Sequence, residues 1–447
     1  MQLKKQPSKS EDKEITVPSR RVQSLSPAEK EWKATIYQKL LKEVDLTILA
    51  GLNTVDAHNR VKEVCENLLS QQRVPLSAVS VQRVIGSIVD EVLGLGPLEV
   101  LMSDREITDI LVNGPDKVYV ERNGKLERTD VVFNNADHLM NIIDRIVTRV
   151  GRRIDESSPM VDARLKDGSR VNAVIPPLAI DGAALSIRRF DPERLTIDDL
   201  INSGTLTSSL VKVMEAIVKS RLNVVISGGT GSGKTTLLNL LSSYIPDDER
   251  IITIEDSAEL QLQQPHVVRL ETRSPNIEGH GMVTQRDLVR NCLRMRPDRI
   301  VLGEVRGGEA LDMLQAMNTG HDGSLTTIHA NSPRDALVRI ENLVSMSGVI
   351  FSTPALRRQI TSAIDVIIHV ERMLDGCRRV VSLAEVNDME GEIITLSEIF
   401  TFERVGVDEA GKVIGELTPT GIVPSFMRHM KERGVDLPLQ VFKSLDA

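Results

Sequence analysis

The chain has 447 residues, of which 41% are hydrophobic and 26% charged, a composition typical of a soluble globular protein with about three domains. Its formal net charge of −8 and its 2% of aromatic residues argue against a nucleic-acid-binding protein, because such proteins need basic and stacking side chains. No apolar run approaches the ~18 residues of a membrane-spanning helix, and no hydrophobic segment of a secretion signal is found at the N-terminus. We therefore expect a cytoplasmic protein.

The N-terminal third of the chain divides into a tail and a helical region. Residues 1–30 are rich in Lys, Ser, Glu, Gln and Pro with few large apolar side chains, so we expect a disordered tail. In residues 31–95 the apolar residues recur at helical spacing, with interruptions near Gly51 and Pro75. This pattern predicts a bundle of three helices.

The pattern changes at residue 96 and again near residue 209. Residues 96–190 contain short β-type runs such as DILVN and ALSIRRF and a helical stretch around 138–150, which predicts an α+β domain. Residues 191–208 carry Pro, Gly, Ser and Thr and are predicted to form a linker. In residues 209–447 β-type and helical runs alternate, which indicates an α/β fold with a largely parallel sheet.

A phosphate-binding loop is the most specific motif of the sequence. It reads GGTGSGKT and lies between the strand-like run NVVIS and the helix-like run KTTLLNLL. Backbone N–H groups of such a loop surround phosphates, its lysine adds a positive charge, and its last hydroxyl can bind Mg²⁺. The predicted nucleotide-binding residues are Gly228, Gly229, Thr230, Gly231, Ser232, Gly233, Lys234, Thr235 and Thr236, with Thr235 also a metal ligand.

Two predicted strand ends carry carboxylates. The run RIVLGEV ends near Glu304, and RIITIED ends in Glu255 and Asp256. Open parallel sheets bind ligands at the carboxyl ends of their strands, so these groups are candidates to hold Mg²⁺ or to polarise water. A typical Walker B motif ends in Asp, so Glu304 departs from it. The sequence leaves open whether Glu304 or Glu255 is the general base, and Glu304 is also a candidate metal ligand.

A histidine and several arginines complete the set of candidates. His329 follows the predicted strand GSLTTIH, where an imidazole could donate to the terminal phosphate. For a lone histidine, a capping or packing role is the more common explanation. Charge in the transition state needs cations, and arginines commonly supply them from another domain or subunit. The candidates are Arg170, Arg188 and Arg189 before the linker, and Arg273, Arg294 and Arg296 after it.

Taken together, GGTGSGKT, IITIEDSAEL, NCLRMRPDRIVLGEVRGGEALDMLQAMNTGHDGSLTTIHANSPRDAL and LSIRRF resemble the secretion ATPase superfamily of type II and type IV secretion systems and type IV pili. The resemblance covers about residues 94–373 and is closest to the tight-adherence (Flp) pilus assembly ATPases. It implies an ATP- and Mg²⁺-dependent motor with a RecA-like C-terminal domain, a PAS-like N-terminal domain and a homohexameric ring. Branches with a tetracysteine zinc module do not fit, since Cys65, Cys292 and Cys377 are far apart and form no CxxC pair.

The same resemblance implies roles for particular residues. Glu255 and Glu304 belong to the Asp box and the atypical Walker B box, His329 ends the His box, and Arg170 and Arg188 stabilise charge from the N-terminal domain. The implied partners are inner-membrane platform proteins, with the motor bound peripherally at the membrane. Three alternatives remain: a type IV secretion ATPase, a RecA-like nucleic-acid motor, and a scaffold that binds ATP without useful hydrolysis.

Overall fold

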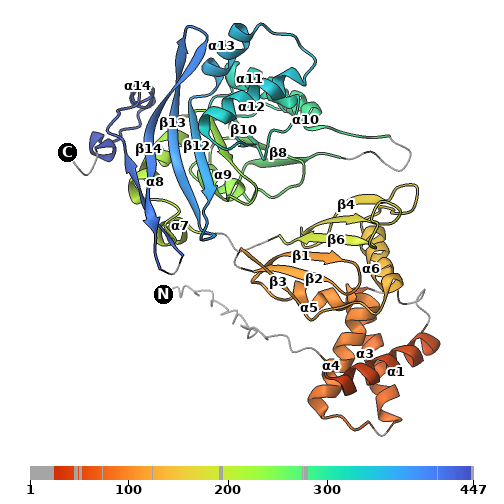
Figure 1. Cartoon of the computed structure of the whole chain (residues 1–447). Coiled ribbons are helices and arrows are strands. Elements are labelled where there is room, and N and C mark those ends of the chain that lie inside the picture. Colours follow the sequence, from red (N-terminus) through yellow and green to blue (C-terminus); the bar gives the residue numbers. More distant parts are fainter. Residues whose placement is uncertain are drawn as a thin grey trace, which may run out of the picture. The chain divides into compact units, whose positions relative to one another are not determined.

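The computed structural model describes residues 25–44, 49, 53–72, 74–122, 124–190, 195–273, 275, 280–409 and 411–443. The chain forms two compact units, Met1–Arg189 and Phe190–Ala447, which we describe separately. Figure 1 shows the elements of both.

The first unit begins with three long helices, as the apolar spacing predicts. They are α1 (Pro27–Glu43), α3 (Thr54–Ser70) and α4 (Ala78–Leu93), and they pack around a shared apolar core. Most of the predicted tail, residues 1–24, lies outside the described residues. The helix starts earlier than predicted because Ser26 and Glu29 form a capping box, in which each side chain accepts the other's backbone N–H.

The rest of the first unit is an antiparallel sheet with helices. The strands are β1 (Ile107–Asn113), β2 (Val118–Arg122), β3 (Lys125–Arg128), β4 (Met160–Arg164), β5 (Arg170–Val174) and β6 (Ala184–Arg188), in the order β3-β2-β1-β6-β5-β4. The helices are the short α5 (Glu99–Met102) and α6 (Ala136–Arg149). Leu139, Ile142 and Ile146 of α6 are fully buried in the core shared with the strands. An α+β organisation is therefore present in residues 96–190.

The second unit is built on one nine-stranded mixed sheet. Its order is β15-β14-β13-β12-β7-β11-β10-β8-β9, in which β12, β7, β11, β10, β8 and β9 are parallel and the β13–β15 pairings are antiparallel. The strands are β7 (Val224–Gly228), β8 (Ile251–Glu255), β9 (Val267–Glu271), β10 (Arg299–Leu302), β11 (Leu325–His329), β12 (Val366–Arg372), β13 (Arg378–Glu390), β14 (Ile393–Val407) and β15 (Val413–Pro419). The predicted α/β class is confirmed.

Helices cover both faces of this sheet (Figure 1). They are α7 (Ile197–Asn202), α8 (Ser208–Lys219), α9 (Lys234–Ser242), α10 (Gln285–Cys292), α11 (Glu309–Asn318), α12 (Pro333–Ser345), α13 (Thr353–Ala363) and α14 (Met427–Glu432). One core contains apolar residues of α7, α8, α9 and α14, and the other contains those of α10 to α13. All residues of β7 and β8 are buried, which explains their uninterrupted apolar runs.

Residues 197–208 differ from the linker that the sequence predicts. Within this stretch lies α7, whose N-terminus is capped by Thr196. Leu200 and Leu206 are 6% and 2% exposed and pack into the core of the second unit. In the sequence these two leucines stand among Gly, Ser and Thr residues, and this composition indicated a linker rather than a packed segment. Any connection between the units is therefore shorter than residues 191–208, of which 191–194 lie outside the described residues.

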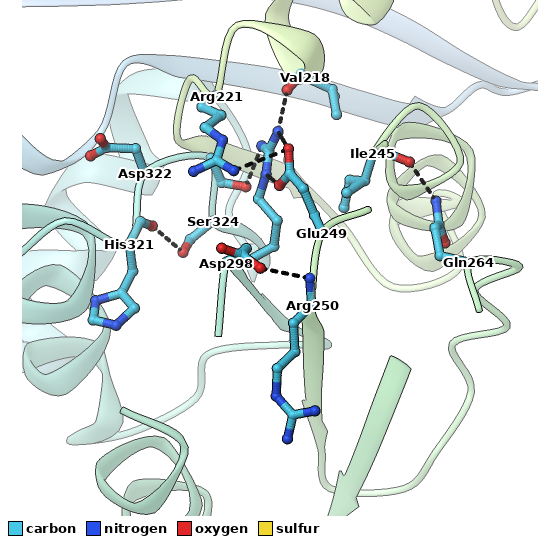
Figure 2. A network of polar contacts seen from close by, with 12 residues as sticks. Val218, Arg221, Ile245, Glu249, Arg250, Gln264, Asp298, His321, Asp322 and Ser324 are labelled. Atoms are coloured by element: carbon cyan, nitrogen blue, oxygen red, sulfur yellow. Dashed lines mark hydrogen bonds and ion pairs between the residues drawn. The ribbon is translucent and has the colours of Figure 1, made fainter. Parts of the chain in front are cut away.

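A buried arginine, Arg299, connects the amino ends of the central strands, and Figure 2 labels two of its partners, Val218 and Glu249. Arg299, the first residue of β10, is fully buried, and its Nε lies 2.5 Å from Oε2 of Glu249. Its Nη atoms donate to the carbonyl oxygens of Gly323 and Val218 at 3.1 and 2.8 Å. Gly323 has φ +82°, and a Cβ there would lie 1.8 Å from Arg299 Nη1, so no other residue fits. Through these contacts Arg299 connects segments that precede neighbouring strands at this end of the sheet.

Asp365, between α13 and β12, makes the stability of the second unit pH-dependent. Burial raises the pKa of its carboxyl to about 6, although Oδ2 accepts the N–H of Asn223 at 2.7 Å. Since the folded-state pKa lies above the ordinary value of 3.8, native Asp365 holds its proton more tightly than the unfolded chain does. Its contribution to stability is complete below about pH 4 and is lost as the pH rises through about 6.

We therefore expect Asp365→Asn to remove up to about 3 kcal/mol of pH dependence from the free energy of unfolding. The amide can still accept the N–H of Asn223. Urea titrations of both proteins between pH 4 and pH 7 measure the effect, and the variant should gain stability relative to the natural chain as the pH rises. A difference that stays constant over this range would contradict the assignment.

Candidate nucleotide-binding site

The GGTGSGKT motif forms a tight loop between β7 and α9. Gly231 and Gly233 have φ +69° and +98°, values that side-chain-bearing residues rarely adopt. Gly228 has an extended backbone but no room for a side chain, because a Cβ would lie 2.4 Å from the carbonyl oxygen of Val370. The loop thus leads directly into the N-terminus of α9, where unpaired backbone N–H groups attract anions.

Lys234, the first residue of α9, is folded back into the loop. Its side chain is buried, and Nζ donates to the carbonyl oxygens of Gly228 and Gly229 at 3.1 and 2.8 Å. Burial lowers the pKa of this ammonium, and Glu304 acts in the opposite direction. The desolvated Lys234 ammonium and the N–H donors of the loop create a positive potential, which a bound phosphate would neutralise.

Glu304 and His329 lie next to this lysine. The ring nitrogens of His329 are 3.4 and 3.5 Å from Lys234 Nζ, and its Nε2 is 3.0 Å from Oε1 of Glu304. Strand pairing produces the arrangement, because β11 aligns His329 with Gly228 of β7. Burial lowers the pKa of His329, which favours the neutral ring. Lys234, Glu304 and His329, which are separated by up to 95 positions in the chain, therefore meet at one edge of the sheet.

The backbone after β10 is held firmly around Glu304. The carbonyl oxygen of Gly303 accepts from the Thr327 hydroxyl at 2.7 Å, and that of Glu304 accepts from the Gln285 amide at 3.0 Å. A Cβ at position 303 would lie 3.0 Å from Cγ of Glu255, which explains the glycine before Glu304. The Glu304 side chain itself is 18% exposed and therefore partly accessible to solvent.

Glu255 ends β8 as predicted but is bound mainly to backbone. Oε2 accepts the N–H groups of Glu259 and Leu260 at 2.7 and 2.9 Å. Oε1 is buried and has no hydrogen-bond partner among the described residues. Burial raises the pKa of the Glu255 carboxyl, and also that of Asp256. The arrangement indicates a positioning role for one oxygen of Glu255 and leaves the other able to accept a proton or a water molecule.

Arg306 is a functional candidate that the sequence analysis missed. Its Nη2 lies 2.8 Å from Oε2 of Glu304, and its Nη1 lies 3.8 Å from Asp256 Oδ2. The backbone N–H groups of Arg306 and Gly307 both donate to Oε1 of Glu309 at 2.7 Å, which fixes the start of the side chain. The sequence GEVRGG places Arg306 two residues after Glu304. Only the structure shows that the side chain of Arg306 turns back to contact the Glu304 carboxylate.

The arginines predicted after the linker are held elsewhere. Arg273 donates from Nε to the carbonyl oxygen of Gly281 at 2.6 Å, and Arg294 donates to that of Arg290 at 3.3 Å. Arg296 adopts a positive φ of 56° in the loop after α10. These contacts give each side chain or its backbone a local structural role.

The arginines predicted before the linker belong to the first unit. Arg170 of β5 and Arg188 of β6 are aligned opposite each other in the sheet. Arg188 is 58% exposed, and its Nε lies 3.1 Å from Asp109 Oδ1. Arg189 donates to the carbonyl oxygens of Asp104 and Ile107. Arg170 and Arg188 are thus side by side on one sheet, and their action on a nucleotide stays a prediction.

A cavity of about 230 Å³ adjoins the phosphate-binding loop within the second unit. Ser232, Gly233, Thr236 and Leu237 form the side next to the loop. Its other lining residues include Leu200, Val370, Cys377, Arg378 and Val380. Apolar side chains with a few polar groups are typical of small-molecule sites, and this one is continuous with a predicted anion site.

The donors near the loop also fit a magnesium ion. The hydroxyl of Thr235 lies in the first turn of α9, and Glu304 supplies a carboxylate beside Lys234. Mg²⁺ prefers oxygen ligands and is usually held by one or two protein groups together with phosphate oxygens and water. An α/β sheet with a phosphate-binding loop, a strand-end glutamate and a histidine at one edge defines a P-loop nucleotide-binding protein.

Comparison with known proteins places this chain in a family. The family described as "Type II/IV secretion system protein" matches residues 91–415, and the chain belongs to it. The match includes the phosphate-binding loop and the boxes around Glu255, Glu304 and His329. The predicted resemblance to type II and type IV secretion ATPases is confirmed, whereas the tight-adherence branch stays a prediction.

Individual relatives are similar over most of their length. A Mycobacterium tuberculosis protein, provisionally named as a conjugal transfer protein, is 40% identical over 309 residues, which are 68% of this chain and 87% of the relative. The type IV secretion system protein VirB11 of Brucella suis is 34% identical over 316 residues, which are 64% of this chain and 88% of the relative. The crystal structure of VirB11 from Brucella suis in complex with sulphate gives a TM-score of 0.35 at 31% identity, covering 65% of this chain and 95% of that one.

Proposed function

We propose that this protein hydrolyses ATP with Mg²⁺ and uses the energy to drive a type IV secretion or conjugal transfer machine. The carrying observation is the convergence of Lys234, Glu304 and His329 at the phosphate-binding loop. The names of the relatives, conjugal transfer protein and VirB11, favour this alternative over assembly of a tight-adherence pilus. Assembly of such a pilus remains the second candidate, which the wording GEVRGGEA and the N-terminal helices favour.

In the proposed reaction, different residues bind the phosphates, hold magnesium and activate water. Backbone N–H groups of Gly231 to Lys234 and the Lys234 ammonium bind the phosphates, and the adjoining cavity receives the nucleoside. Magnesium held by Thr235 and Glu304 would neutralise phosphate charge. Glu304, or Glu255 through its unpartnered Oε1, orients the attacking water and takes its proton. Neutral His329 has a single N–H, which would donate to the terminal phosphate when nucleotide is bound in place of its contact with Oε1 of Glu304.

The assembly and location belong to the same proposal. We expect a homohexameric ring that associates peripherally with inner-membrane platform proteins. No helix in the described parts of the chain combines the length and apolarity needed to cross a bilayer. Phosphate release from purified protein with MgATP tests the activity, and mass measurement with and without nucleotide tests the ring. Absence of phosphate release from folded, assembled protein would support the scaffold alternative instead.

Glu304→Gln should separate nucleotide binding from chemistry. The amide cannot accept the proton of the attacking water, so we expect retained ATP binding and turnover reduced at least about a hundredfold. Single-turnover phosphate release and equilibrium ATP binding give the two quantities. The exposed Glu416 of β15 provides a matched control, and Glu416→Gln should behave as the natural chain. Equal losses of affinity and turnover would restrict Glu304 to metal binding, and Glu255→Gln would then test the base.

A further inference from the structure

The hairpin of β12 and β13 extends over the phosphate-binding loop of the same chain. Pairing of β12 with β7 aligns Val370 with Gly228, so the residues that follow Val370 continue past the end of β7. The hairpin returns at Arg378, which is aligned opposite Arg372. This register brings two exposed arginines to the edge of the sheet where the loop lies.

Arg378 contacts the loop directly. Its Nε donates to the carbonyl oxygen of Gly231 at 2.9 Å. Its stem lies against Gly233, since a Cβ there would be 3.3 Å from Arg378 Cδ. Arg372 lies close by, with Nη1 3.6 Å from the position of a Cβ on Gly231. Among the described residues, hydrogen bonding of Arg378 uses Nε, which leaves the Nη groups able to donate to an anion.

The hairpin is anchored by its neighbours without using Arg378. Asp375 accepts the N–H groups of Cys377 and Val413, both at 2.9 Å. Arg379, the next residue, is 5% exposed, bonds Asp375 at 3.2 Å and lies over the ring of Phe402. Successive side chains of a strand point to opposite faces, so one arginine of the pair stabilises the sheet while the other faces the loop.

The charge of Arg378 favours an anionic ligand in the loop. Arg372 is aligned opposite Arg378, so two positively charged side chains stand at this end of the hairpin. An anion bound in the loop would accept charge-assisted hydrogen bonds from the Nη groups of Arg378. Because Arg378 also lines the adjoining cavity, it lies between the predicted phosphate and nucleoside positions.

We propose that Arg378 contacts the polyphosphate of the nucleotide bound to its own chain. The site then carries one arginine in cis, from the second unit, in addition to any arginine supplied by the first unit or by a neighbouring subunit. This inference rests on the proposed nucleotide binding and assigns part of it to a residue outside the phosphate-binding loop. The group it recognises is a chain of phosphates rather than the base.

The test compares Arg378→Gln and Arg378→Lys in the full chain. Calorimetry measures binding of MgATP and of inorganic tripolyphosphate. Loss of a charge-assisted hydrogen bond should weaken both ligands about tenfold or more in Arg378→Gln. Lysine should restore affinity in part, since it keeps the charge without the planar fork. The melting temperature without ligand should stay unchanged, as should all values for Arg404→Gln, a control on the exposed face of β14.

The outcomes separate this inference from the proposed function. If the natural chain binds MgATP and Arg378→Gln binds both ligands equally well, the contact of Arg378 with phosphate is refuted while nucleotide binding stands. If only MgATP is weakened, Arg378 acts on the nucleoside and the inference is likewise refuted. A lowered melting temperature without ligand, together with no rescue by lysine, would assign Arg378 a structural role. If the natural chain binds no MgATP, the proposed function itself fails.

Discussion

Lys234→Ala is expected to abolish tight ATP binding or hydrolysis. The lysine supplies the positive charge at the phosphates, and its ammonium donates to two carbonyl oxygens of the loop. We expect phosphate release to fall to the background of the assay. Equilibrium binding of MgATP and steady-state phosphate release measure the two effects.

This variant needs a check of folding, because the side chain of Lys234 is buried. Removing it leaves the carbonyl oxygens of Gly228 and Gly229 without this donor. Lys234→Gln is therefore tested in parallel, and thermal melting shows whether either protein is intact. Lys219→Ala, on the exposed part of α8, is the matched control. Near-normal phosphate release from folded Lys234→Ala would refute the motor function.

Arg188→Ala, or Arg170→Ala, is expected to lower turnover by about 10³ to 10⁵, the range for an arginine that stabilises the transferring phosphoryl group from outside the nucleotide-binding domain. Both residues belong to the first unit, so they act only if that unit approaches a nucleotide. Binding of MgATP should change much less than turnover. Single-turnover phosphate release with each variant distinguishes the two arginines.

Mixing the inactive variants shows whether the arginine acts on a neighbouring subunit. Assemblies of Lys234→Ala and Arg188→Ala chains contain sites with an intact loop and an intact arginine from the neighbour. Restored turnover indicates action between subunits, and continued inactivity indicates action within one chain. A truncated chain gives the complementary result, and it should begin at Phe190, since Leu200 and Leu206 belong to the core of the second unit. Full activity of residues 190–447 would contradict a role for either arginine.

The sequence was most informative where a function is encoded in consecutive residues. The phosphate-binding loop requires glycines at positions with positive φ and a lysine at the helix start, and these requirements leave a readable pattern. The apolar runs around Val224–Gly228 and Ile251–Glu255 likewise indicated buried parallel strands, because such strands are covered on both faces. Helical spacing of apolar residues indicated the N-terminal bundle, because each of its helices buries one face in a shared core.

The sequence was less informative where two distant segments must meet. The position of His329 beside Lys234 and its contact with Glu304 arise from the pairing of β11 with β7 and β10. Arg306 and Arg378 resemble ordinary surface arginines in the sequence, yet one turns onto Glu304 and the other onto Gly231. Their partners depend on loop conformation and strand register, which local residue preferences do not specify.

The sequence by itself therefore determined the class of fold, the family and the position of the phosphate-binding loop, since these follow from short-range patterns of glycine and apolar residues. Tertiary structure decided which charged groups surround that loop and that residues 197–208 belong to the second unit. The physical reason is that a charge acts on its neighbours in space. The neighbours of Lys234 come from strands that are up to 95 positions away in the chain.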